Sequence, residues 1–135
     1  MSLEIQQRDR EGIAVLEMKG RITVGKEATA LREKVAELAV SKVRNLVFNM
    51  EGVDYIDSTG LGALVMCATT LRKTGGNVKL VNLNRRNIEL LVMTRLATCF
   101  EIFTDEGDAA GSYYPDRKIK TFDILDFVSK MKNEE

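Results

Sequence analysis

The apolar residues of this chain recur with two spacings, one typical of amphipathic helices and one typical of strands. Four segments carry apolar side chains three or four positions apart, so that one helical face is hydrophobic. They are residues 26–39, residues 61–71, the stretch with Ile88, Leu91, Val92 and Leu96, and residues 121–131. We expect a helix in each, with Gly75 and Gly76 ending the second and Thr121 capping the last.

Shorter apolar runs between these segments predict the strands. The first two form a hairpin, and a turn leads into a third, short strand. The predicted strands are residues 3–8, 13–18, 20–24, 45–50, 77–83 and 101–104. Because strands then alternate with helices, the later strands should pair in parallel through helical crossovers. We therefore predict an α/β fold in which a mixed β-sheet has amino-terminal antiparallel strands and a parallel βαβ portion, covered by about four helices.

Length and charge narrow the classes of protein that fit this pattern. The 135 residues are enough for one domain with its own core. The 20 basic and 20 acidic residues cancel, so we expect no direct nucleic-acid binding. No run approaches the roughly 20 apolar residues that cross a bilayer, and the first residues do not resemble a signal peptide. We expect a cytoplasmic protein without membrane insertion.

The residue types present argue against catalysis. The chain has no histidine, which removes the usual base of serine and cysteine hydrolases and the commonest metal ligand. Cys67 and Cys99 lie far apart in apolar surroundings, as buried free thiols do. No phosphate-binding loop of the P-loop type is present. We expect no enzymatic activity, no metal site and no cofactor.

The most informative segment is residues 57–62, with the sequence DSTGLG, between the strand at residues 45–50 and the helix at residues 61–71. Functional groups of parallel sheets gather at the carboxyl ends of the strands, so Asp54, Asp57 and Ser58 should lie at that edge. Ser58 stands where a helix begins. Its hydroxyl can accept a phosphate there, or Asp57 or Ser58 can simply cap the helix.

Three segments together resemble a known family. They are the strand at residues 45–50, the junction VDYIDSTGLG at residues 53–62, and the strand GGNVKLVNL at residues 75–83. They are similar to those of a STAS domain of the bacterial anti-sigma-factor antagonist type, and the resemblance covers residues 3–104. It implies the STAS fold, with a STAS domain over residues 1–110. Residues 111–135 would then be a linker and a terminal helix, either packed on the domain or used for association.

The resemblance also implies a function. Ser58 would be phosphorylated by a partner that is both an anti-sigma factor and a serine kinase of the histidine-kinase-like ATPase fold. The unphosphorylated protein would sequester this partner, phosphorylation would release it, and a phosphoserine phosphatase would reverse the switch. The implied partner-binding residues are Thr23, Asp54, Tyr55, Asp57, Thr59, Gly60, Leu61 and Gly62.

Some alternatives stay open. Many family members place an aspartate where this chain has Thr23, and if that carboxylate helps to contact the kinase, the partner must compensate or differ. STAS domains also serve as non-switching accessory subunits of lipid-transport complexes or signalling scaffolds. Homodimer formation is open as well. A receiver domain, with Asp54 or Asp57 as phosphoacceptor, is disfavoured, because it would need an acidic cluster after its first parallel strand to hold Mg²⁺ and this chain has none near residues 19–24.

Overall fold

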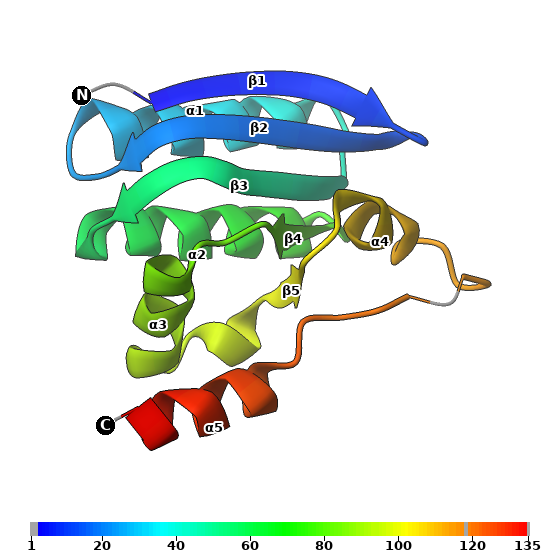
Figure 1. Ribbon diagram of the computed structural model, residues 1–135. Helices are drawn as coiled ribbons and strands as arrows, with labels where there is room; N and C mark the ends of the chain where they lie inside the picture. Colours follow the sequence, from blue (N-terminus) through cyan, green and yellow to red (C-terminus); the bar gives the residue numbers. More distant parts are fainter. Residues whose placement is uncertain (1–2, 118, 135) are drawn as a thin grey trace.

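A mixed sheet forms the centre of the computed structural model, which describes residues 3–117 and 119–134 (Figure 1). Its five strands follow chain order across the sheet. The β1–β2 pair is antiparallel and the other three pairs are parallel, which confirms the predicted topology. The strands are β1 (Leu3–Arg10), β2 (Ile13–Ile22), β3 (Asn45–Ile56), β4 (Asn77–Val81) and β5 (Glu101–Phe103).

The predicted helices are present with shifted ends. Helices α1 and α2 pack side by side on one face of the sheet, and α3 lies at the carboxyl end of β4 (Figure 1). A short helix, α4, follows β5 in a segment where the apolar spacing predicted no helix. The described helices are α1 (Lys26–Val40), α2 (Ser58–Lys73), α3 (Arg85–Met93), the 3₁₀ helix η1 (Ala97–Cys99), α4 (Glu106–Gly111) and α5 (Ile124–Glu134).

The face of the sheet under α1 and α2 carries the main hydrophobic core. Its strand residues alternate with those of the other face, as the pleat requires. Leu16, Phe48 and Leu80 from three neighbouring strands are all fully buried in this core. Cys67 belongs to it as well, and burial raises the pKa of its thiol to about 12. Cys99 is half-buried, so only the first thiol is buried as fully as predicted.

The opposite face, which we call the back face, is closed by the chain that follows β5. Ala109 and Ala110 of α4 pack on a smaller apolar cluster that includes Val15 and Val47. Beside it lies the carboxylate of Glu106, which is 8% exposed. This carboxylate accepts hydrogen bonds from the guanidinium groups of Arg8 and Arg10, at 2.8 Å and 2.9 Å, and from the side-chain amide of Asn49 at 2.9 Å. The back face therefore combines apolar packing with an ion-pair network.

Two strands differ from the prediction. The prediction of a turn and a separate strand at residues 20–24 is wrong, because β2 continues to Ile22. Its pairing with β3 shifts register twice on the way, between Glu17 and Lys19 and between Gly20 and Arg21. Strand β3 continues past the predicted end at Met50 to Ile56, since this long β2 offers a pairing partner as far as that residue. Asp54 therefore lies within a strand and not in the loop after it.

Two helix boundaries also differ. Helix α3 ends at Met93, and Leu96 instead precedes η1, because Arg95 between them takes a left-handed φ of 63°. Thr121 does not cap the terminal helix. The carboxylate of Asp123 takes that role and accepts a hydrogen bond of 3.0 Å from the backbone N–H of Asp126.

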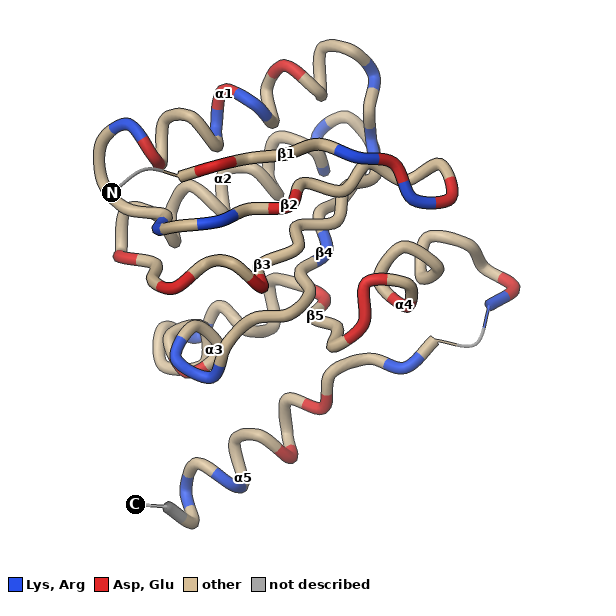
Figure 2. Tube along the Cα trace, turned by 45° about the horizontal axis from the view of Figure 1, so that its top comes forward, with Lys and Arg blue, Asp and Glu red and all other residues tan. Residues whose placement is uncertain are grey.

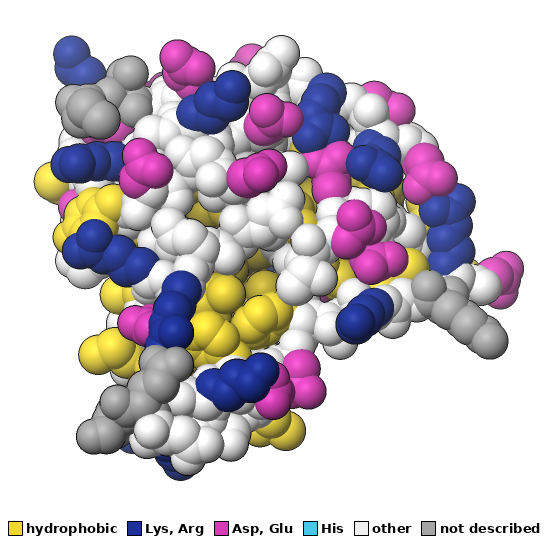
Figure 3. All heavy atoms as spheres, viewed as in Figure 1, with side chains coloured by type: hydrophobic (Ala, Val, Ile, Leu, Met, Phe, Trp, Pro, Cys, Tyr) yellow, Lys and Arg dark blue, Asp and Glu magenta, His cyan; other side chains and the backbone are white. Residues whose placement is uncertain are grey.

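Helix α5 is joined to the domain mainly at its beginning. Phe122, just before the helix, donates its backbone N–H to the carbonyl of Ile102 at 2.9 Å, and its ring packs on the core together with Ile124. Leu125 is 81% exposed. Figure 3 shows hydrophobic side chains at the surface between the sheet and α5. Whether this segment serves packing or association stays a prediction.

Charged residues of both signs are interspersed along the described chain, as the zero net charge suggests (Figure 2). Within the described residues, no helix is long and apolar enough to span a membrane.

Candidate functional site

Asp57 organises the junction between β3 and α2. Its carboxylate accepts a hydrogen bond of 2.7 Å from the backbone N–H of Gly60, which caps α2, and one of 2.9 Å from that of Val24 in the β2–α1 loop. These backbone donors, Gly60 first, hold the pKa of Asp57 below its ordinary value. Of the two caps that the sequence allowed, Asp57 is the one present, so Ser58 does not have this role.

Ser58 and Thr59 are the first residues of α2, and both are exposed. No hydrogen bond joins either hydroxyl to any residue that the structure describes. Backbone N–H groups at the start of a helix give this position a partial positive charge, which favours an anion. The Ser58 hydroxyl is thus accessible, without a local structural task, and in a place that tolerates a phosphate.

The two glycines of this turn have opposite surroundings. A Cβ on Gly60 would lie 1.8 Å from the backbone oxygen of Ile22, so only glycine fits where α2 crosses β2. A Cβ on Gly62 would meet no atom within 4 Å. Leu61, between them, is buried in the core, whereas Gly62 is exposed. Of the predicted partner-binding residues, Gly60 and Leu61 therefore face inward and Gly62 faces outward.

The other predicted site residues flank this turn. Thr23 is half-buried in the β2–α1 loop, next to the residue that Asp57 binds. Asp54 is exposed and Tyr55 is half-buried, both near the end of β3. The structure thus places Asp54, Asp57 and Ser58 at one edge of the sheet, as predicted, and adds the β2–α1 loop to that edge.

Helix α3 contributes residues that the sequence analysis did not assign to the site. Asn84 caps α3, accepting a hydrogen bond of 2.8 Å from the N–H of Asn87. The side chain of Asn87 is buried and donates to the carbonyl of Val53 at 3.1 Å, which holds α3 against β3. The sequence contained one signal for this helix, because Asn84 follows β4 and asparagine is a favoured helix cap. A helix that begins at the carboxyl end of the next parallel strand lies beside the site.

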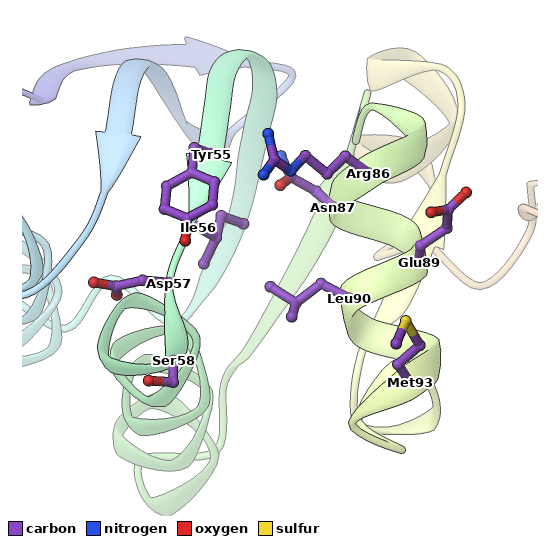
Figure 4. A pocket seen from close by; sticks show the side chains of 9 residues that line it. All are labelled: Tyr55, Ile56, Asp57, Ser58, Arg86, Asn87, Glu89, Leu90 and Met93. Carbon is purple, nitrogen blue, oxygen red and sulfur yellow. The ribbon is translucent and has the colours of Figure 1, made fainter.

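A groove of about 300 Å³ separates the start of α2 from α3 (Figure 4). Ser58 lies at its α2 side. The guanidinium of Arg86 lies over the ring of Tyr55, 4.9 Å from its centroid. The lining residues are Tyr55, Ile56, Asp57, Ser58, Arg86, Asn87, Glu89, Leu90 and Met93.

This chain is similar to known proteins in sequence and in fold. Residues 4–109 match the family described as STAS domain. An anti-sigma-B factor antagonist of Bacillus subtilis is 34% identical over 102 residues, which are 76% of this chain and 92% of that protein. The anti-sigma-F factor antagonist RsfB of Mycobacterium tuberculosis is 30% identical over 113 residues, 80% of this chain and 87% of that protein.

Solved structures match as well. The anti-sigma factor antagonist SpoIIAA in its unphosphorylated form superposes with a TM-score of 0.64 and 15% identity, covering 86% of this chain and 100% of that one. The phosphorylated form of SpoIIAA, from Bacillus, gives the same TM-score at 16% identity, covering 82% and 99%. These likenesses show that the fold is shared.

Proposed function

The chain belongs to the STAS domain family, and we propose that it is an anti-sigma-factor antagonist whose partner binding is switched by phosphorylation of Ser58. In the unphosphorylated state it sequesters an anti-sigma factor that is also a serine kinase, and phosphorylation releases this partner. The protein itself is a binding module and not an enzyme.

The observation that carries this proposal is the position of Ser58. Its hydroxyl is exposed at the first residue of α2, while the neighbouring carboxylate of Asp57 performs the capping. A serine that is both accessible and free of a structural task suits a modified residue better than a cap. The antagonist names of relatives at 30% identity and above, which align over most of this chain, support the same function.

The mechanism of release follows from charge and size. Phosphorylation adds a charge of about −1.5 to −2, which the helix start stabilises by roughly 0.3–1 kcal/mol when exposed. Within the isolated domain the phosphate points to solvent, so the fold should tolerate it. Under a close-fitting partner, the same group brings an unpaired charge and added bulk next to Asp57. Release is therefore a local effect and needs little refolding.

The two forms of SpoIIAA support this view. The chain matches both with a TM-score of 0.64, so in that protein the fold accommodates the modified and the unmodified state. For this chain, amide chemical shifts should change only around Ser58 upon phosphorylation. Large shifts throughout the sheet would refute a local mechanism.

The partners follow from the proposed switch. One is an anti-sigma factor with the histidine-kinase-like ATPase fold, and the other is a phosphatase that acts on phosphoserine. The outward residues Thr59 and Gly62 would contact the kinase directly, with Thr23, Asp54 and Tyr55 at the rim of the surface. Gly60 and Leu61 would shape this surface from inside, since both are buried.

The test is phosphorylation by a purified kinase encoded near this gene. The chain is incubated with MgATP and the kinase, and the phosphate is located by intact-protein and peptide mass spectrometry. We expect one phosphate on Ser58, none on Ser58→Ala, and full modification of the control Ser41→Ala, because Ser41 is exposed at the end of α1, away from the proposed surface. Unmodified protein should bind the kinase, and the phosphorylated form should be released.

A different result would change the assignment. If several active candidate kinases leave Ser58 unmodified, the protein is better described as a non-switching accessory subunit of a lipid-transport complex or a signalling scaffold. A gene neighbourhood with a transporter ATPase and permease would point the same way.

A further inference from the structure

The groove between α2 and α3 extends the Ser58 surface onto a second helix. Ile56 and Leu90 are among its apolar lining residues, and Met93 stands at its rim on the α3 side (Figure 4). Its volume of about 300 Å³ is at the lower end of the range for ligand-binding pockets, enough for one or two large side chains. Because Ser58 lines the same groove, a partner that covers Ser58 would also reach these residues.

Met93 is an exposed apolar residue at the end of α3 that also lines the groove. Its side chain is 75% exposed, whereas Ile88 and Leu91 of the same helix are buried. Methionine suits binding surfaces, because its flexible thioether adapts to the shape of a partner. An exposed methionine beside an apolar groove is therefore a suitable anchor for a bulky side chain of the partner.

The charged residues that line the groove differ in whether they already have a hydrogen-bond or ion-pair partner. Glu89 forms an ion pair of 2.7 Å with Arg85, and the carboxylate of Asp57 accepts backbone N–H groups. Arg86, by contrast, stacks on Tyr55 and makes no hydrogen bond or ion pair with any residue that the structure describes. Stacking holds the guanidinium plane in place while leaving its N–H donors available for a carboxylate.

We propose that this groove is the second half of the partner-binding surface, and that it receives a segment of the anti-sigma factor with a bulky apolar side chain and a carboxylate. The apolar side chain enters between Leu90 and Met93, and the carboxylate pairs with Arg86. This inference rests on the proposed function, because the occupant is the same partner that covers Ser58. It adds a chemical description of the partner segment and assigns binding to α3.

The experiment measures the affinity of the purified anti-sigma factor kinase for the unphosphorylated full-length chain. Arg86→Gln and Met93→Gln change the groove, and both side chains are exposed, so the fold should be unaffected. Arg44→Gln removes the same charge at the opposite end of the sheet, and Val40→Gln changes another exposed apolar residue, on α1. Thermal unfolding is measured for all four variants to check that each is folded.

We expect each groove variant to weaken binding at least about fivefold, as interface anchors do, and each control to stay within twofold of the unsubstituted protein. Arg86→Gln should also reduce the salt dependence of binding, which Arg44→Gln should not.

Two negative results are distinguishable. If the unsubstituted protein binds the kinase and becomes phosphorylated on Ser58, but both groove variants bind equally well, the groove assignment is wrong and the proposed function stands. If the unsubstituted protein neither binds nor is modified, the proposed function fails and this inference fails with it.

Discussion

Two carboxylates with lowered pKa values, Asp57 at the carboxyl edge and Glu106 on the back face, stabilise this molecule in different ways. Asp57 binds backbone N–H groups of two segments, from Val24 and Gly60. Glu106 instead binds the side chains of Arg8, Arg10 and Asn49. At the edge, the backbone is fixed and the outward side chains remain free. On the back face, the polar side chains are engaged with one another.

Because of this difference, we expect partner binding to depend on the carboxyl edge and the stability of the fold to depend on the back face. In the proposed function, Ser58, Thr59 and Gly62 are available to a partner because Asp57 already caps the helix. The groups around Glu106 have no comparable freedom, so we assign the back face to the stability of the fold. Substitutions at the two places should accordingly affect different measurements.

The largest effect should come from the inward side of the edge. In Gly60→Ala, the new Cβ would lie 1.8 Å from the backbone oxygen of Ile22, so α2 must move away from β2. We expect a loss of about 3 kcal/mol or more in the free energy of unfolding, measured by urea denaturation. A loss under about 1 kcal/mol would mean that α2 moves easily and does not hold Ser58 rigidly.

On the back face, Glu106→Gln removes the carboxylate that two arginines share. Arg8 and Arg10 are 37% and 46% exposed, so water compensates part of the loss. We expect about 2–3 kcal/mol of destabilisation in the same urea assay, with unchanged affinity for the kinase. A variant of native stability but weaker binding would contradict the assignment of this face.

The same network predicts a pH dependence. The guanidinium of Arg8, opposed by partial burial, lowers the pKa of Glu106 from 4.5 to about 2. The ionised form stabilises the folded state, so this contribution is complete above pH 4.5 and is lost as the pH falls towards about 2. We expect a loss of about 2 kcal/mol over this interval, and a smaller one in Glu106→Gln. Equal acid sensitivity of both proteins would show that other groups dominate.

A smaller effect is expected for Asp57→Ala. The variant loses the α2 cap and the bond to Val24, at about 1–2 kcal/mol. Hydrogen exchange should increase at the backbone amides of Val24 and Gly60 and stay unchanged around Glu106. Faster exchange at both places would mean that the two regions unfold together.

The smallest effect has the opposite sign. Gly62→Ala adds a methyl group to open space on a helix, which should stabilise the protein by about 0.5–1 kcal/mol. If a partner approaches this backbone closely, the same variant should bind the kinase more weakly. Higher stability with unchanged affinity would remove Gly62 from the binding surface.

Local patterns predicted much of this protein. Apolar spacing along the chain located α1, α2, α3, α5 and the mixed sheet, and the sequence DSTGLG located the helix start that presents Ser58. These features depend on residues close together in sequence, where periodicity and capping preferences act. The motif could not distinguish Asp57 from Ser58 as the cap, because both residue types suit that position.

Contacts between distant segments were decided only by the tertiary structure. Pairing with β2 extends β3 to Ile56 and places Asp54 in a strand. Tertiary packing also sets Arg86 over Tyr55 and Glu106 between Arg8 and Arg10. From the sequence alone, each of these charged residues would be expected at the surface without a specific partner. The partner of each charged residue lies many residues away in the sequence, and only the folded sheet brings the two together. Local spacing cannot predict such contacts, because they depend on which side chains are buried and on how the strands pair.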